Sequence, residues 1–246
     1  MVGLVRAVVL IGAVAVVTAG FTGCDSTQLK NQRAKIAATR ELQSRKVQAV
    51  GRKSPDVVVK RTAFVSGSPQ SAVVVELQNR SDEPQTDVPV AVGVRLANGR
   101  RELLNRRRGL DWFQTHLPSV AASSSALWIF QTKRRIRRGE RVFALAGRQT
   151  QSFGIGEGGL PKIDGRHLSA NSPTRTALIA VKNSSGVPQK NLQVYAVVRH
   201  RGKYLAAGKR KLPTLEAGKS AELKVPLIGR AGRYPVTVQI PPTVFA

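Results

Sequence analysis

The sequence predicts a mainly β protein made of two tandem β-sandwiches. From Asp56 onward valine recurs at alternate positions, as in Val88, Val90 and Val92, and no long helical run interrupts this pattern. A second observation is that one order of residues occurs twice. Alternation with a period of two places one face of a strand on the core and the other face toward solvent.

The repeat shows as a constant offset between two segments. Ser71–Ser81 aligns with Arg175–Ser185 at an offset of 104 residues. Further along, Leu117-Pro118 aligns with Leu212-Pro213 at an offset of 95 residues. The smaller offset means that the first copy carries about nine extra residues, which fall between Arg101 and His116. Agreement in order and in alternation indicates two copies of one β unit.

Each copy has five clear strands, and seven are expected. In the first copy they lie near Asp56–Val65, Ala72–Asn79, Val88–Leu96, Ser125–Phe130 and Arg141–Ala146. In the second copy they lie near Arg166–Ala170, Thr176–Asn183, Leu192–Arg199, Ala221–Leu227 and Tyr234–Ile240. Turns such as Asn98-Gly99 and Arg201-Gly202 separate them. Strands at this spacing favour an immunoglobulin-like or fibronectin-like sandwich.

The predicted organisation has five parts. They are a signal peptide (1–23), a lipidated cysteine with a basic stalk (24–55), a first immunoglobulin-like domain (56–148), a Gly-rich linker (149–162) and a second domain (163–246). We expect each domain to fold alone. The glycines between Gly154 and Gly159 resemble a phosphate-binding turn, but no helix pattern follows them, which favours a flexible linker.

Cys24, the one cysteine, lies where a lipid anchor would be attached. Arg6 is followed by a charge-free stretch from Ala7, which ends in Phe21-Thr22-Gly23-Cys24. This arrangement is typical of an export signal. The last four residues resemble the lipobox of bacterial lipoproteins, in which the cysteine receives a diacylglyceryl group and becomes the mature N-terminus. An uncleaved membrane helix over the 18 residues Ala7–Cys24, and a signal peptide with an incidental cysteine, remain alternatives.

The segment after Cys24 is a candidate stalk. Residues 25–51 are rich in Ala, Gln, Lys and Arg, and they lack Pro and Gly until Gly51. A helix and a partly disordered tether both fit, because the apolar stripe is thin. Residues 24–55 have a net charge of +6, and Lys30, Arg33 and Lys35 would strengthen membrane attachment beside a lipid chain.

Positive charge extends over the whole chain. The net charge is +26, with +1 in residues 1–23, +6 in 24–55, +8 in 56–148 and +11 in 149–246. Such a surface attracts polyanions. Anionic phospholipids, anionic wall polymers, extracellular DNA and acidic proteins are the partners expected outside a bacterial cell. The alternative is that the arginines reflect only a GC-rich genome.

A resemblance to a known class of domain adds to this interpretation. In both copies an apolar strand ends in Asn, a polar turn with Pro follows, and an alternating Val-rich strand comes next. This order resembles the immunoglobulin-like domains of bacterial envelope lipoproteins. The resemblance implies an adhesion, spacer or protein-binding role rather than catalysis, and it defines no functional residue.

Two basic clusters are the candidate binding residues. The extra segment of the first copy contains Arg106, Arg107 and Arg108, followed by Trp112 and Phe113. Because these aromatics have no counterpart in the second copy, we predict that they lie on the surface beside the arginines. The second cluster, in an expected hairpin, comprises Lys133, Arg134, Arg135, Arg137 and Arg138.

Other parts of the sequence help to rank these clusters. Lys209–Lys211 is a weaker counterpart in the second copy, so the first domain is expected to have the more selective surface. Trp128 and Phe130 are expected in the core, because Leu223 and Val225 take their places in the second copy.

Enzymatic and metal chemistry find little support in the sequence. The three histidines, His116, His167 and His200, have no metal-ligand spacing with carboxylates, and each is expected at the surface or half-buried. Both His116 and His167 are expected to titrate near neutral pH, but nothing near them indicates a switch. The few acidic residues are scattered in turns, so we expect neither catalytic residues nor a cofactor.

The sequence therefore favours a lipid-anchored, extracytoplasmic lipoprotein on the outer face of the bacterial cytoplasmic membrane or elsewhere in the envelope. It would act as a non-catalytic binding or scaffolding module. The alternative is an exported protein that captures polyanions such as DNA, wall polymer or anionic lipid. The sequence does not indicate an oligomeric state.

We predict that Cys24→Ala abolishes labelling by a fatty-acid analogue and releases soluble or uncleaved protein, because the thiol is the only group on which this anchor can form. Labelling in bacteria, followed by membrane fractionation, checks this. Unchanged labelling of the variant would refute the lipobox interpretation.

Overall fold

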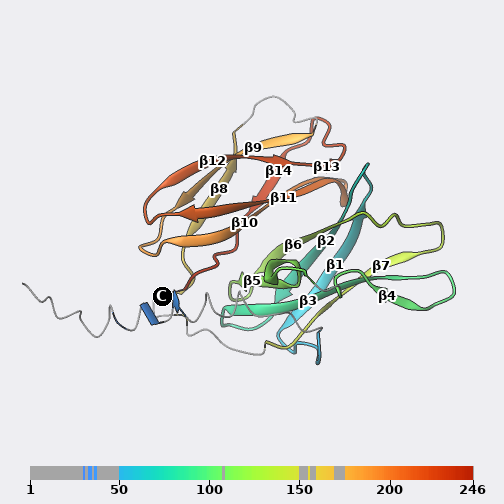
Figure 1. The fold of residues 1–246 in the computed structure, drawn as a ribbon, viewed down its shortest axis with the longest axis horizontal. Coiled ribbons are helices and arrows are strands. Elements are labelled where there is room, and N and C mark those ends of the chain that lie inside the picture. Colours follow the sequence, from blue (N-terminus) through green and yellow to red (C-terminus); the bar gives the residue numbers. More distant parts are fainter. Residues whose placement is uncertain are drawn as a thin grey trace, which may run out of the picture.

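The computed structural model describes residues 30, 33–34, 36–37, 50–106, 109–149, 155, 159–168 and 175–245. The chain is mainly β, as predicted, and its strands form a sandwich-like arrangement of several sheets (Figure 1). Lys30, Arg33–Ala34 and Ile36–Ala37 are helical. The rest of the predicted stalk, Cys24 and the signal sequence lie outside the described residues. Within the described ranges, no helix combines the length and the apolar character needed to cross a bilayer.

The first repeat packs two antiparallel sheets against each other. One sheet has the order β1-β2-β6. In the other, β3 is central, with β4 and β5 along one side and β7 along the other. The bounds are β1 (Val57–Val65), β2 (Ser71–Asn79), β3 (Gln85–Arg95), β4 (Arg101–Leu103), β5 (His116–Val120), β6 (Ser125–Thr132) and β7 (Arg141–Ala146).

The second repeat has the same layout. Its two sheets have the orders β12-β9-β8 and β13-β11-β10-β14. The bounds are β8 (Ile163–His167), β9 (Thr176–Asn183), β10 (Gln189–His200), β11 (Lys203–Leu215), β12 (Ser220–Pro226), β13 (Ile228–Gly229) and β14 (Val236–Gln239). The long strand β11 takes the place that β4 and β5 share in the first repeat, where the extra residues separate them.

Strand pairing reproduces both offsets of the sequence repeat. Val88 pairs with Leu117 in the first repeat, and Leu192 pairs with Leu212 in the second. The central strands β3 and β10 are thus offset by 104 residues, and their partners β5 and β11 are offset by 95 residues. Equivalent side chains therefore occupy equivalent places in the two sandwiches.

One asparagine at the end of an inner strand ties each repeat together. Asn79 Nδ2 donates to the carbonyl oxygens of Glu83 (2.7 Å) and Ala121 (3.0 Å). Asn183 Nδ2 donates in the same way to Val187 O (2.9 Å). Both asparagines are fully buried, so these hydrogen bonds satisfy backbone carbonyls that water cannot reach. The strand-final Asn seen in the sequence is thus a structural residue.

Several strands differ from the prediction. Strand β8 begins at Ile163, three residues earlier than expected, because Ile163 pairs with Asn183. Strands β5 and β11 are not among the five strands located in each copy from the sequence, and each contains a proline. Pro118 and Pro213 lie at one equivalent point, beside Asp87 and Asn191, which have positive φ angles of 51° and 55°. The ladder skips a residue there, and proline is tolerated at such bulges.

The core of the first repeat is aromatic, as the sequence predicts. Trp128 and Phe130 are 0% and 2% exposed, and their rings stack at 6.1 Å between centroids. In the second repeat Val225 is fully buried and Leu223 half-buried at the equivalent places.

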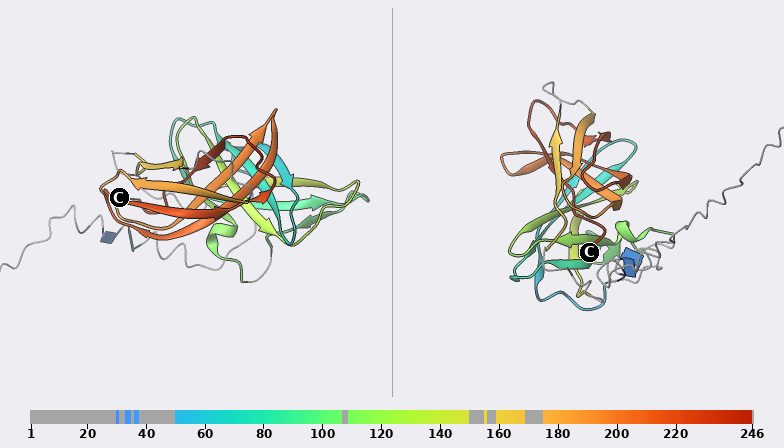
Figure 2. Two further views of the ribbon diagram at one scale, coloured as in Figure 1. Left: turned by 90° about the horizontal axis from the view of Figure 1, so that it is seen from above. Right: turned by 90° about the vertical axis from the view of Figure 1, so that its left-hand side faces the viewer.

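The second repeat is stacked on the first by a sheet-on-sheet contact (Figure 2). Val74 of β2 and Ile129 of β6 point away from their own sandwich, yet both are fully buried. Tyr195, Val197 and Ala207 of the second repeat are buried in the same cluster as the first repeat's core. In the second repeat the place of Ile129 is taken by the exposed Lys224, so that face is solvated.

Polar contacts fix the rotation of the repeats about this apolar contact. Tyr204 Oη donates to Glu76 Oε2 at 3.4 Å, and the Gln239 side chain accepts from Leu127 N. The C-terminal segment contacts both repeats, because Ser119 Oγ donates to Pro242 O at 3.0 Å. Further along the same segment, the Gln189 side chain bonds the backbone of Val244.

We predict that Ile129→Lys lowers the free energy of unfolding by about 2–4 kcal/mol, because it places an unpaired charge in the contact between the repeats. Chemical denaturation of the full chain measures the change. The matched control, Lys224→Ile, alters an exposed equivalent position and should change stability by less than about 0.5 kcal/mol. Equal effects of the two variants would contradict this account of the contact.

Candidate functional site

The extra segment of the first repeat folds inward, which corrects one prediction. Trp112 and Phe113 begin a 3₁₀ turn, η1 (Trp112–Gln114), capped by the Asp111 side chain, which accepts from Gln114 N. The two aromatic residues are only 5% and 6% exposed. The prediction that they lie on the surface is therefore wrong. Arg106 is exposed, and Arg107 and Arg108 lie outside the described residues.

Polar partners hold Trp112 in place. Its Nε1 donates to Asp87 Oδ1 at 3.1 Å, and its ring stacks on His116 with 5.0 Å between centroids and an interplanar angle of 4°. The Phe113 ring packs edge-on against Trp112. A tryptophan can be buried only where its N–H finds a partner, and Asp87 supplies one. The missing counterpart in the second repeat is explained by this local core.

Asn105 fastens the same segment to the sheet. Its Oδ1 accepts from Val92 N at 2.9 Å, and its Nδ2 donates to Val90 O at 2.7 Å and Gln114 O at 3.1 Å. Asn105 is buried, so all these bonds are shielded from water. The extra segment thus packs against β3, and its aromatic side chains stabilise this packing. We call this segment the wedge.

Burial lowers the pKa of His116 to about 4, against the prediction that it titrates near neutral pH. Removal of the ring from water disfavours its charged form. Asp87 Oδ1 lies 3.8 Å from Nε2, but that oxygen already accepts from Trp112 Nε1, so burial dominates. His116 Nδ1 is 2.9 Å from the hydroxyl of Thr115.

The second cluster is exposed and forms the main candidate site. The β6–β7 loop meets the β3–β4 hairpin at one end of the first repeat, on the right in Figure 1. A Cβ at Gly139 would lie 3.5 Å from Cβ of Ala97. We call this surface the basic tip; it comprises Arg95, Arg100, Arg101, Glu102, Lys133, Arg134, Arg135, Arg137, Arg138, Glu140 and Arg141. Its nine cations and two carboxylates give a net charge of +7.

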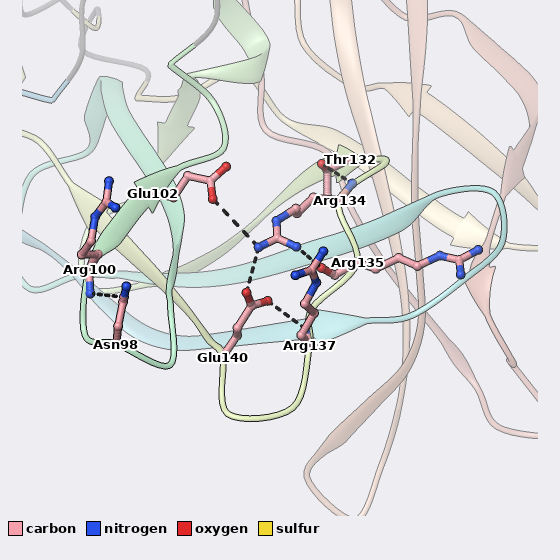
Figure 3. Close-up of polar contacts among 8 residues, drawn as sticks. All are labelled: Asn98, Arg100, Glu102, Thr132, Arg134, Arg135, Arg137 and Glu140. Carbon is pink, nitrogen blue, oxygen red and sulfur yellow. Dashed lines mark hydrogen bonds and ion pairs between the residues drawn. The ribbon is translucent and has the colours of Figure 1, made fainter.

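The Arg134 side chain makes contacts within the basic tip rather than extending into solvent (Figure 3). Its guanidinium binds Glu140 Oε1 at 2.9 Å, approaches Glu102 Oε2 at 3.9 Å, and donates to the backbone oxygen of Arg135. Glu140 also accepts from Arg137 N at 2.8 Å. This backbone hydrogen bond, and after it Arg134, holds the pKa of Glu140 below its usual value. Glu140 is thereby occupied in shaping the loop, and Glu102 lies near the same guanidinium group.

The other cations of the basic tip are available to a ligand. Lys133, Arg135, Arg137 and Arg138 are exposed, and their side chains have no carboxylate partner among the described residues. Four further arginines belong to the basic tip but were not predicted, namely Arg95, Arg100, Arg101 and Arg141. Each lies alone or in a pair beside a turn, so only the pairing of β3 with β4 and β7 brings them together.

The predicted counterpart in the second repeat is not an open cluster. Burial lowers the pKa of Lys209 to about 8, while the charge of Asp111 opposes that shift. Burial also raises the pKa of Tyr195, which pairs with Lys209, and Asp111 adds to that rise. Asp111 belongs to the wedge of the first repeat, so Lys209 is part of the contact between the repeats. Arg210 and Lys211 remain exposed.

Two open hollows lie away from the basic tip, among the residues that the structure describes. One, of about 500 Å³, lies between the repeats and is lined by Ser66–Gln70, Arg175 and Leu227–Arg230. The other, of about 520 Å³, lies on the outer face of β8, β9 and β12, where Asp164 and Glu222 face Arg166 and Lys182. The described part of the chain contains no group of three His, Cys, Asp or Glu side chains that could hold a metal ion.

Comparisons with known proteins add little to this geometry. No family model and no curated protein matches the sequence. Among solved structures, the chain is similar to a transglutaminase of red sea bream, with 10% identity and a TM-score of 0.23 over 89% of this chain and 34% of that one. It is also similar to a β-glucuronidase of glycoside hydrolase family 2, with 13% identity and a TM-score of 0.25 over 80% and 25%. The chain thus spans about a third and a quarter of these enzymes.

We predict that acid destabilises the fold through His116. Its pKa is about 4 in the folded chain and 6.5 ordinarily, so its contribution is complete above pH 6.5. That contribution is lost as the pH falls from about 6.5 to about 4, by about 3 kcal/mol in all. The free energy of unfolding, measured across this pH range, should show this decrease with falling pH in the wild type. The His116→Gln variant should lack the decrease. Identical slopes would contradict the assignment.

Proposed function

We propose that this protein is an exported, lipid-anchored, non-catalytic binding module whose ligands are anionic polymers or surfaces. Its location would be the outer face of the bacterial cytoplasmic membrane or elsewhere in the envelope. The single observation that carries the binding proposal is the basic tip, where nine cations outnumber two carboxylates, both of which lie beside Arg134.

The chemistry of the basic tip favours binding. Guanidinium groups stay charged at every physiological pH, and their planar forks fit phosphate and carboxylate oxygens. Such groups serve poorly as acids or bases but well as anion ligands. The remaining polar clusters, around Asn79, Asn105, Asp87 and Asn183, already have partners within the fold. These features support a module that binds rather than one that catalyses.

The place of the basic tip supports an anchored binding module. Near Arg52 the chain coming from Cys24 joins the first repeat, where Ser54 N bonds Ala146 O (3.0 Å) and Arg148 N bonds Arg52 O (2.7 Å). Ala146 ends β7, whereas Arg141 of the basic tip begins it. Five residue steps along this strand separate the two points by about 17 Å. An anchor at Cys24 would therefore leave the basic tip free to meet a ligand.

The basic tip suits ligands that carry phosphate or carboxylate groups. These groups occur in anionic lipid, wall polymer, nucleic acid and acidic envelope proteins. Electrostatic binding of this type releases counterions, so its strength falls steeply with salt. A scaffold that acts through apolar contacts would lack that dependence.

We predict that alanine at Lys133, Arg135, Arg137 and Arg138 weakens binding of inorganic polyphosphate and flattens its salt dependence, because each lost contact removes about 0.7 from the slope of log K against log salt. Titrations at several salt concentrations measure this. Arg134 is left unchanged, since it shapes the loop.

The control for that experiment is Arg210→Ala with Lys211→Ala, which removes exposed charge from the second repeat without touching Lys209. An equal loss in the control, per charge removed, would mean that binding is generic and that the basic tip has no special role.

A further inference from the structure

Three arginines of the basic tip lie directly opposite one another on neighbouring strands. Arg95 in β3 pairs with Arg101 in β4 on one side and with Arg141 in β7 on the other. Directly paired residues of antiparallel strands point to the same face, and strands lie about 4.8 Å apart. The three side chains, all exposed, therefore form a row across the sheet. We call this row the arginine ladder.

The fold does not require the arginine ladder. Like charges directly opposite each other destabilise a sheet. At the equivalent places of the second repeat stand Arg199, Tyr204 and Pro235, so only one arginine is kept. An unfavourable row that the sister repeat dispenses with indicates a ligand that supplies the missing negative charge.

An aromatic ring lies flat on the same face, next to the arginine ladder. Phe143 follows Arg141 by two residues and pairs with Gly93, which precedes Arg95 by two residues. A Cβ at Gly93 would come within 2.5 Å of Phe143 Cζ and 2.7 Å of Cε1, so the ring crosses over the glycine. Arg101 Cζ lies over this ring at 5.5 Å from its centroid. The ring and the guanidinium form one stacking surface, and Phe143 remains partly exposed.

The corresponding face of the second repeat is already in use. There Tyr195, Val197 and Ala207 are buried against the first repeat. At the equivalent places the first repeat has Ala91, Gly93 and Leu103, of which Leu103 is partly exposed. The small residues on β3 leave this face flat, and its bulk comes from Phe143 instead.

We propose that the outer face of the β4–β3–β7 sheet binds single-stranded nucleic acid, an inference that rests on the proposed function and specifies its ligand. Phosphates would lie along the arginine ladder, and a base would stack on the Phe143–Arg101 surface, since flat sheet faces with aromatic and guanidinium planes are used this way. A polyanion that lacks aromatic rings would bind to the arginines but would not stack on Phe143. A duplex hides its bases within the stack.

The test compares two single-stranded probes of equal charge on the full chain. One is an oligothymidylate of about 12 nucleotides, and the other is an abasic oligodeoxynucleotide of the same length. Fluorescence anisotropy should show about tenfold tighter binding of the oligothymidylate, because one stacked base contributes on that scale.

Two variants separate stacking from charge. Phe143→Leu keeps an apolar contact over Gly93, and it should lower oligothymidylate affinity about tenfold while leaving abasic affinity unchanged. Arg95→Gln with Arg141→Gln should weaken both probes equally. Thermal unfolding should show no loss of stability in either variant, since all three positions lie on the outer face, and relief of like-charge repulsion can only stabilise the double arginine variant.

Equal wild-type affinity for the two probes would overturn the proposal, while polyphosphate binding at the basic tip would still stand. Equal loss of both probes in Phe143→Leu would also overturn it, because the ring would then act only through the shape of the face. Failure of the wild type to bind either probe or polyphosphate would instead remove the proposed function itself.

Discussion

The contact between the two repeats is the constraint on which the rest of the structure depends. With a single cysteine, one chain cannot close a disulfide, so packing alone holds each sandwich. The first repeat places Val74 and Ile129 on the outside of its β1-β2-β6 sheet, and such a face is stable only when it is covered. The second repeat covers it with Tyr195, Val197 and Ala207. The faces that remain open, with Lys224 on the second repeat and Arg95 on the first, are charged. Side-chain chemistry thus distinguishes the covered face from these two open faces.

The wedge of the first repeat also reaches the contact between the repeats. Trp112 and its neighbours fill space beside β3, and Asp111 places a negative charge near Lys209 and Tyr195 of the second repeat. A lysine shielded from water is tolerated when a carboxylate is close, which accounts for the place of Asp111 near Lys209. The extra segment was predicted as a binding loop, and its aromatics instead pack into a local core of the first repeat.

Charge on this molecule is therefore of two kinds. Some cations are held in place, as Arg134 is between Glu140 and Glu102, and as Lys209 is near Asp111. Others, including the arginine ladder, are exposed without a carboxylate partner in the described part of the chain. The first kind shapes the loops and the second kind is free to act at a distance. Part of the net charge of +26 thus holds the structure together, and the rest is available for the binding that we propose.

The sequence by itself determined the two-sandwich fold, most strand positions and the aromatic core. Period-two valines, strand-final Asn79 and Asn183 and the repeat offsets are local patterns, and each has one physical solution in a β-sandwich. The tertiary structure alone decided the surface. Trp112 is buried because Asp87, 25 residues away, offers its N–H a partner, and no local pattern reveals this. Arg95, Arg101 and Arg141 are scattered along the chain, and strand register alone makes them neighbours. Packing and register depend on contacts between distant residues, which composition and spacing do not encode.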